Sequence, residues 1–290
     1  MNEERKIKKE HHISTKLLTS FQHSGTIDTL ITIENKEDLK DCLNEYKKFH
    51  ILGKGSNSLI HQSAKSIPFI KISPTYEGLS HSKTTLTAGA GIAVNQLLSY
   101  SQKNNITGFE FMAGVPASVG GMIAMNFGCW NKEMKDIIKS VDVFIPEKGF
   151  RTLSNKECKF GYRTSIFQHH SWIILKATFK IKEEKNSVIK NTIKSYVKSR
   201  LEKQPIRTMT FGSVFKNPQS NSAAYLIEKS GLKGYQKNNI KISNHHANFM
   251  ENISNGTAQN AIDMISYIKN KIFILYKINL IPEVSIFDDK

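Results

Sequence analysis

Residues 51–60 read Ile51-Leu52-Gly53-Lys54-Gly55-Ser56-Asn57-Ser58-Leu59-Ile60. A short apolar strand runs into a turn built on two glycines, and polar residues follow. Glycine lets successive backbone N–H groups point into one concavity, which can bind a phosphate. The stretch lacks the third glycine and the following amphipathic helix of a dinucleotide-binding fingerprint. Taken alone, it fits an ordinary tight turn better than a phosphate site.

A second glycine-rich stretch lies between Gly108 and Gly128. Small residues flank Pro116, and the pair Gly120-Gly121 follows. Such a stretch lets the backbone approach a flat or charged ligand closely. We expect a helix over 117–125 whose N-terminus faces an anion; a close-packed helix crossing is the alternative.

Two further motifs carry polar groups suited to chemistry. Residues 160–167 place Arg163 in a short polar island between apolar segments, and residues 212–218 place Ser213 beside a glycine, with Lys216 three positions later. An isolated serine or arginine is most often a surface group. The order of the motifs along the chain therefore carries more information than any one of them.

Periodicity predicts a mixture of strands and helices around these motifs. Asn35 has the side chain of a helix N-cap. The expected strands cover 28–33, 49–52, 67–72, 84–88, 140–145, 172–181 and 283–287. The expected helices cover 37–49, 92–102, 188–201, 223–230 and 257–276. The charged segment 182–190 is the best candidate for a domain boundary. The class is α+β.

Composition excludes several classes of protein. The chain has 290 residues, of which 39% are hydrophobic and 23% charged, as in a soluble globular protein. Its three cysteines, Cys42, Cys129 and Cys158, form neither a disulfide framework nor a CxxC metal site, which favours a reducing compartment. Residues 1–6 do not resemble a signal peptide. The apolar stretch 272–281 is too short to span a bilayer.

The net charge of +16 has three interpretations. One is a protein that binds nucleic acid. We favour a second, in which lysines spread along a Lys-, Asn- and Ile-rich chain are simply solvated. The third is compatible with the second: a positive field attracts polyanionic small molecules.

Taken together and in order, the motifs resemble those of the UDP-N-acetylenolpyruvoylglucosamine reductase (MurB) family. The stretches that match are 53–57, 114–121, 162–165, 212–218, 231–235, 246–249 and 282–284. The resemblance runs from about Thr19 to Phe287. The chain departs from the family pattern in having Lys54, His23-Ser24, Ala117, Cys129-Trp130-Asn131 and Asn238-Asn239. The short span from Arg163 to Ser213 resembles the compact subtype of the family.

The resemblance implies a three-part α+β flavoenzyme. An FAD-binding region of the PCMH/vanillyl-alcohol-oxidase type would consist of two subdomains, and a substrate-binding domain would follow. The expected boundaries are 1–71 with the C-terminal strand 281–290, then 72–185, and then 186–280.

The resemblance also implies an activity, the NADPH-dependent reduction of UDP-N-acetylglucosamine enolpyruvate to UDP-N-acetylmuramate in peptidoglycan synthesis. FAD carries the hydride. By motif match, Ser213 donates a proton, Arg163 stabilises the enolate or carboxylate, and Glu283 is the third catalytic residue. The residues expected to bind the cofactor are Gly53, Lys54, Gly55, Ser56, Asn57, Gly114, Val115, Pro116, Ser118, Val119, Gly120, Gly121, Asn126 and Gly128. Substrate binding falls to Tyr162, Lys216, Asn217 and His246.

Two other functions remain open at this point. One is a sugar or alcohol oxidase on the same flavin fold, which would lack the set of Ser213, Arg163 and Glu283. The other is a basic nucleic-acid-binding protein. For the reductase we expect a cytoplasmic monomer that binds a UDP-sugar and NADPH and needs no metal, nucleic acid or membrane.

Overall fold

The computed structural model describes residues 7–219 and 221–289. The chain forms two compact units. Unit 1 consists of the described residues within Met1–Glu10, Leu30–Lys54 and Pro68–Lys198, and unit 2 of those within His11–Thr29, Gly55–Ile67 and Ser199–Lys290. Each unit has a hydrophobic core and therefore has an interior of its own. The sequence-based division into three parts stays a prediction.

The first sheet has four strands in the order β1 (Lys8–Ser14), β2 (Thr26–Ile33), β5 (Phe69–Ile72) and β3 (His50–Ile51). Strands β2 and β3 both pair in parallel with β5. Helix α1 (Lys36–Glu45) connects β2 to β3, and the Asn35 side chain caps it by accepting a hydrogen bond from the Asp38 N–H. The helix ends earlier than expected, because Tyr46 leaves the helical conformation.

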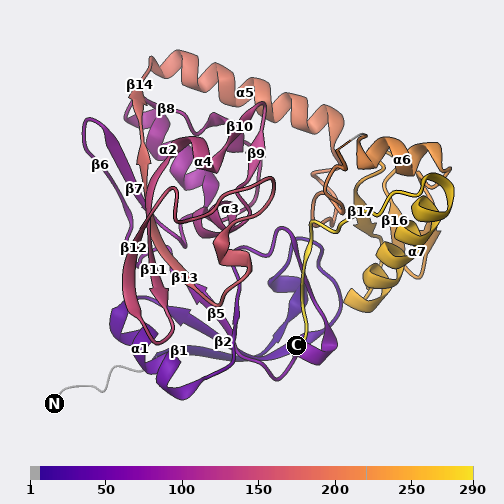
Figure 1. Ribbon diagram of the computed structural model, residues 1–290, viewed down its shortest axis with the longest axis horizontal. Coiled ribbons are helices and arrows are strands. Elements are labelled where there is room, and N and C mark those ends of the chain that lie inside the picture. Colours follow the sequence, from indigo (N-terminus) through magenta and orange to yellow (C-terminus); the bar gives the residue numbers. More distant parts are fainter. Residues whose placement is uncertain (1–6, 220, 290) are drawn as a thin grey trace. The chain divides into compact units, whose positions relative to one another are not determined.

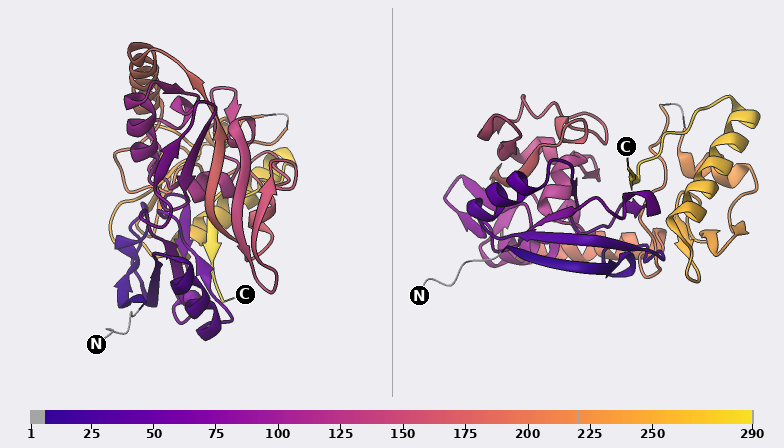
Figure 2. Two further views of the ribbon diagram at one scale, coloured as in Figure 1. Left: turned by 90° about the vertical axis from the view of Figure 1, so that its left-hand side faces the viewer. Right: turned by 90° about the horizontal axis from the view of Figure 1, so that it is seen from below.

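The main sheet of unit 1 has five antiparallel strands, which Figures 1 and 2 show running alongside one another. Their order is β12 (Gly149–Ser154), β11 (Ile138–Ile145), β13 (Ile173–Lys180), β7 (Thr85–Gly89) and β6 (Leu79–His81). Along β11, the buried residues Val141, Val143 and Ile145 alternate with more exposed ones. This period of two gives the strand one buried face.

Three helices complete the core of unit 1: α2 (Val94–Lys103), α3 (Val119–Ala124) and α4 (Met134–Ile137). Helix α3 contacts β7 and β13. Phe109 and Phe179 pack edge to face in this core, with ring centroids 5.4 Å apart. Strand β8 (Ile106–Thr107) pairs with β14 (Lys182–Glu183) at the edge of the unit.

A small hairpin in unit 1 is formed by β9 (Gly128–Cys129) and β10 (Lys132–Glu133). Its two turn residues, Trp130 and Asn131, have φ angles of 51° and 60°, as a two-residue hairpin turn requires. The Trp130 ring stacks on Tyr196 of α5 (Asn186–Lys203), with centroids 3.9 Å apart. This contact supports a turn that lacks the usual glycine.

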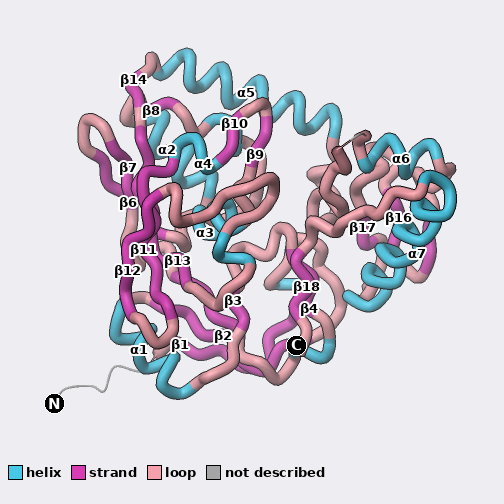
Figure 3. The backbone as a smooth tube through the Cα atoms, viewed as in Figure 1, coloured by secondary structure: helices cyan, strands magenta, loops and turns pink. Residues whose placement is uncertain are grey.

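In unit 2, strands β4 (Ser58–Ile60) and β18 (Ser285–Phe287) pair in parallel, and Figure 3 shows them side by side. Strands β15 (Gln236–Lys237), β16 (Ile240–Ile242) and β17 (Met250–Asn252) form a second sheet. Helices α6 (Ala223–Lys229) and α7 (Ala258–Tyr276) pack against each other. The Phe21 and Phe211 rings lie 4.7 Å apart in this core, which joins the N-terminal part of the unit to the C-terminal part.

The expected helices and strands are confirmed, with ends that differ by a few residues. The structure adds β1, β12 and several strands of two or three residues. It also adds 3-10 helices at Thr15–Leu17, Gln62–Ala64, Glu110–Met112 and Ile166–Gln168. Within the described residues, no helix is both long and apolar enough to cross a membrane.

Candidate functional site

The glycine-rich loop after β3 needs its glycines for steric reasons. The Leu52 N–H donates to the Ile70 carbonyl and fixes the start of the loop. At Gly53 a side chain would lie 2.7 Å from Ser118 Oγ. At Gly55, with a φ of +65°, a side chain would collide with the Leu18 carbonyl. Gly55 is therefore required both by its φ angle and by its packing.

The backbone amides of this loop point to an anion site. From Gly53 to Asn57, no backbone N–H donates a hydrogen bond to another described residue. A run of unused donors beside two glycines has the composition of an anion nest, in which a phosphate accepts several backbone N–H bonds. Lys54 in this loop is exposed, and its positive charge contributes to lowering the pKa of Lys71, after the larger effect of burial.

The segment from Gly114 to Gly121 is organised differently. Gly114, Val115 and Pro116 are exposed or half-buried. The Val119 and Gly120 amides donate to the carbonyls of Ile92 and Ala90, and the Gly121 amide donates to Ser118 Oγ. The amides at the start of α3 are thus engaged within the protein. The expected part of this segment in cofactor binding stays a prediction.

Arg163 lies in a tight loop between residues 161 and 164, whose ends hydrogen-bond to each other. Its backbone has a φ of 54°, an uncommon conformation for arginine. Its Nη2 donates a 2.7 Å hydrogen bond to the Gly128 carbonyl. Its guanidinium carbon lies 5.4 Å from the centroid of the Phe127 ring and 5.6 Å from that of the exposed Tyr162. These contacts orient the cation.

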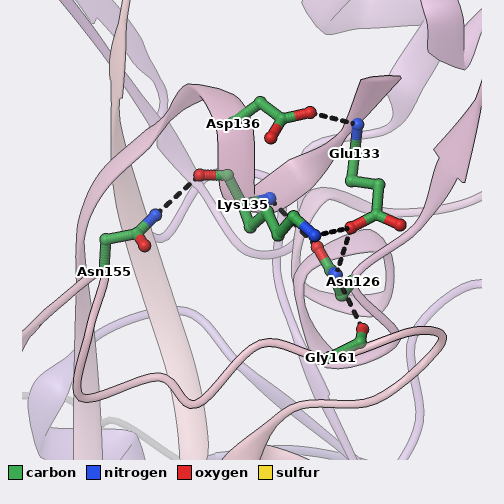
Figure 4. A network of polar contacts seen from close by, with 6 residues as sticks. All are labelled: Asn126, Glu133, Lys135, Asp136, Asn155 and Gly161. Atoms are coloured by element: carbon green, nitrogen blue, oxygen red, sulfur yellow. Dashed lines mark hydrogen bonds and ion pairs between the residues drawn. The ribbon is translucent and has the colours of Figure 1, made fainter. Parts of the chain in front are cut away.

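A polar network, drawn in Figure 4, fixes the beginning of this loop. The fully buried Asn126 donates from Nδ2 to Glu133 Oε2 (3.0 Å) and to the Gly161 carbonyl (2.8 Å). Its Oδ1 accepts from the Lys135 N–H. Asn126 is thus a structural clamp in unit 1.

Glu133 brings a negative charge into the same network. Lys135 Nζ lies 2.7 Å from its carboxylate. Burial alone would raise the pKa of Glu133, but hydrogen bonds from Lys135 and Asn126, together with the charges of Lys135 and Arg163, lower it. Glu133 is therefore ionised at neutral pH. The sequence analysis missed this residue, because a glutamate within Lys132–Asp136 looks like part of a solvated turn.

In unit 2, Ser213 and Glu283 lie on neighbouring extended segments. Ser213 bridges to Phe249, and the Glu283 N–H donates a 2.8 Å hydrogen bond to the Val214 carbonyl. Both residues are partly exposed. The structure thus brings two of the three expected catalytic residues together within one unit, whereas Arg163 belongs to unit 1.

Asn248 holds the segment that carries Ser213. Its Oδ1 accepts from the Phe215 N–H (3.0 Å), and its Nδ2 donates to the Phe215 carbonyl (2.8 Å). Its own carbonyl accepts from the Val214 N–H. Asn248 is buried, and it stands within a stretch, 246–249, to which the sequence analysis gave no structural role.

Three expected substrate residues also lie in unit 2. The Lys216 N–H donates to the Ile281 carbonyl, which places Lys216 next to the C-terminal segment. Asn217 Oδ1 accepts from the Ala223 N–H at the start of α6. His246 Nδ1 accepts from the Asn248 N–H. Burial, followed by the charges of His245 and Lys233, lowers the pKa of His246, so its ring is neutral with the proton on Nε2.

Within residues 7–219 and 221–289, no group of three or more His, Cys, Asp or Glu side chains is placed to hold a metal ion.

Comparison with known proteins covers most of the chain. Residues 27–151 match the family described as "FAD binding domain", and residues 204–287 match "UDP-N-acetylenolpyruvoylglucosamine reductase, C-terminal domain". A relative named UDP-N-acetylenolpyruvoylglucosamine reductase from Caldanaerobacter subterraneus subsp. tengcongensis is 33% identical over 276 residues, 94% of this chain and 91% of its own. One from Clostridium botulinum (strain Eklund 17B / Type B) is 32% identical over 274 residues, 93% of this chain and 90% of its own.

A solved structure agrees with these relatives. The crystal structure of UDP-N-acetylenolpyruvylglucosamine reductase (MurB) from Thermus caldophilus superposes with a TM-score of 0.82 at 27% identity. The match covers 97% of this chain and 99% of that one. The fold is therefore shared over the whole length.

Proposed function

Since the chain belongs to the UDP-N-acetylenolpyruvoylglucosamine reductase family and is an FAD-dependent oxidoreductase, we propose that it uses NADPH to reduce UDP-N-acetylglucosamine enolpyruvate to UDP-N-acetylmuramate. This reaction is a step in peptidoglycan synthesis. The observation that carries the proposal is the pairing of Ser213 with Glu283 on neighbouring segments, joined by the Glu283–Val214 hydrogen bond. The proposed reaction consumes NADPH, which is available in the cytoplasm. The proposal therefore includes a cytoplasmic location.

The residues present fit FAD. The unused amides of Gly53 to Asn57 suit the two phosphates of a dinucleotide. The buried Asn57 Oδ1, which has no hydrogen-bond partner among the described residues, is an acceptor that a polar group of the cofactor can satisfy. Bound FAD supplies the hydride chemistry. The remaining work, which is proton delivery and orientation of the substrate, falls to side chains.

Ser213 is the proposed proton donor to the substrate carbon that becomes electron-rich. A serine hydroxyl is a weak acid in water, so its placement and its neighbours must make the transfer possible. Asn248 supports this role, because its hydrogen bonds to residues 214 and 215 hold the backbone immediately after Ser213. Lys216, three residues further along the same segment, is proposed to add positive charge to this part of the site.

Glu283 and Arg163 have different proposed roles. Glu283 is joined through its backbone to Val214, so its carboxyl group is carried by a segment that is fixed relative to Ser213. Arg163 is proposed to pair with the carboxylate of the enolpyruvyl group. A planar guanidinium can bind a carboxylate through two parallel hydrogen bonds, which an ammonium cannot do. Its attachment to Gly128 restricts its orientation before substrate arrives.

Tyr162, Lys216, Asn217 and His246 are proposed to contact the UDP-sugar. His246 presents an N–H donor at Nε2, because its Nδ1 already accepts from Asn248. A neutral donor suits a sugar hydroxyl or a phosphate oxygen without adding a charge. Tyr162 is exposed and can offer both its ring face and its hydroxyl.

A spectroscopic assay with product analysis tests the proposal. The purified protein should show the visible absorption of oxidised FAD, which NADPH bleaches under anaerobic conditions. Addition of UDP-N-acetylglucosamine enolpyruvate should then restore the colour and yield a product two mass units heavier, corresponding to the addition of two hydrogens. A protein that is reduced by NADPH but reoxidised only by oxygen would overturn the proposed substrate.

A further inference from the structure

Asn57 joins three segments of unit 2 that are far apart in sequence. It is the last residue of the loop 53–57. Its Nδ2 donates to the Phe211 carbonyl (2.8 Å) and, over 3.4 Å, to the Ser213 carbonyl. Its own carbonyl accepts a 3.0 Å hydrogen bond from the Ser285 N–H. One residue therefore contacts the loop with unused amides, the segment of Ser213 and the segment that follows Glu283.

The two polar atoms of the Asn57 side chain differ in their hydrogen bonding. The Nδ2 donor is satisfied within the protein, whereas the buried Oδ1 acceptor has no partner among the described residues. Leaving a buried acceptor unmatched is unfavourable. A ligand that fills the amide nest of this loop and satisfies Oδ1 therefore stabilises the side-chain position from which Nδ2 holds residues 211 and 213.

We propose that Asn57 is a positioning residue that couples occupation of the loop 53–57 by the cofactor to the placement of Ser213 and Glu283. This inference rests on the proposed function, which assigns the cofactor to the loop and proton delivery to Ser213. Coupling of this kind is reciprocal: if the bound cofactor orders residues 211–213, ordering of those residues also tightens cofactor binding. The proton donor is then fully positioned only in the flavin-loaded protein.

Amide hydrogen exchange tests the coupling without using catalysis. Exchange is followed by mass spectrometry in the flavin-loaded protein and in the same full-length protein after its flavin has been removed. The amides of Val214, Phe215 and Glu283 all donate hydrogen bonds in this region. In the wild type, their exchange should slow by about tenfold when FAD binds, since one additional ordering contact of ordinary strength changes an opening equilibrium by that factor.

The decisive variant is Asn57→Ala, with Asn57→Ser as a second variant should the first fail to fold. The backbone amides of the loop remain, so FAD should still bind, but more weakly, because the Oδ1 acceptor and the reciprocal coupling are lost; exchange is therefore measured at saturating FAD. In the variant, FAD binding should slow amide exchange at residues 211–216 and 281–285 by less than twofold. The matched control is Thr210→Val, which removes the 3.3 Å hydrogen bond from the Gly212 N–H to Thr210 Oγ1 in the same segment but does not touch the loop. This control should keep the response to FAD.

Three results would overturn the proposal. The first two are an FAD-dependent slowing that persists in the Asn57 variants and the absence of any slowing in the wild type. Loss of the response in Thr210→Val as well would also overturn it, because general loosening of the segment would then explain the effect. These outcomes can be distinguished from failure of the proposed function. An incorrect substrate assignment would appear instead as failure of the enolpyruvyl UDP-sugar to reoxidise the flavin, with hydrogen exchange unchanged.

Discussion

Arg163 and Gly128 are joined by a 2.7 Å hydrogen bond from Nη2 to the backbone carbonyl, although they are 35 residues apart in the chain. A Cβ atom at position 128 would lie 3.3 Å from Arg163 Nη1 and 2.6 Å from Glu133 Cγ. Glycine at 128 therefore allows the cation and the carboxylate to approach the same stretch of backbone.

Gly128→Ala should disturb both side chains. The added methyl group overlaps with Glu133 and comes within 3.0 Å of the Lys132 carbonyl, and overpacking of this kind costs about 1–3 kcal/mol of stability. Chemical denaturation measures that loss. Reoxidation of reduced flavin by substrate should slow more than reduction by NADPH, because Arg163 is displaced. Unchanged stability together with unchanged reoxidation would mean that the hairpin shifts freely to accept the methyl group.

Glu133→Gln removes a negative charge while nearly preserving shape. The single amide oxygen can still accept from Lys135 and Asn126, but the negative charge that now lies 2.7 Å from Lys135 Nζ is lost. We expect a loss of about 1–3 kcal/mol in the free energy of unfolding and slower reoxidation of flavin, with FAD still bound.

Asp136→Asn is the matched control for Glu133→Gln. Asp136 accepts from the Glu133 N–H at 2.8 Å, whereas Asn126 Nδ2 donates to the carboxylate of Glu133. The control should lose less stability and keep its rate of reoxidation. Equal effects in the two variants would argue that any change to this turn is damaging and that the Glu133 carboxylate has no special part.

The stability of the protein should fall between pH 6.5 and pH 4 because of His23. Burial lowers the pKa of this fully buried histidine to about 4, and its Nε2 accepts a hydrogen bond from the Ile60 N–H. The unfolded state binds the proton first, at a pKa near 6.5. Stability is thus complete above that pH and declines as the pH falls, by up to about 1.4 kcal/mol per unit. Burial also lowers the pKa of His246, which acts in the same direction.

Urea unfolding at pH 7, 6 and 5 measures this dependence. His23→Gln retains an acceptor for the Ile60 N–H but has no titrating group in this range, so its stability should vary less with pH than that of the wild type. If the stability of the variant and that of the wild type fell in parallel with pH, His23 would not control the acid dependence of stability.

The sequence predicted the longer elements because their burial is periodic. Helix α7 and strand β11 bury one face each, with regular spacing of Ile, Val and Met residues. Strand β1 gave no such signal, since its residues are polar on both faces. Strands of two residues, such as β9 and β10, are too short to show any period and form because the Trp130-Asn131 turn brings them together.

The residues of the candidate site also differ in how far the sequence predicts them. Ser213, Arg163 and Glu283 could be predicted as candidates because their motifs follow a family order. Asn248 and the contacts of Asn57 depend on hydrogen bonds between distant segments, which leave no local pattern in a single sequence. Glu133 looks like part of a solvated turn until the hairpin brings it back to Asn126. For the same reason, the sequence did not reveal what the amides in the first turn of α3 bind. They donate to the carbonyls of Ala90 and Ile92, which precede α2 in the chain.

Transient kinetics of Ser213→Ala test the central claim most directly. Ser213 is assigned only to proton delivery, so stopped-flow absorbance should show NADPH bleaching the flavin at close to the wild-type rate. Reoxidation by UDP-N-acetylglucosamine enolpyruvate should fall by about 10²–10⁴-fold or more, the range for loss of a general acid. Arg163→Lys should slow the same half-reaction. If Ser213→Ala slows reduction and reoxidation equally, or slows neither, Ser213 is not the proton donor.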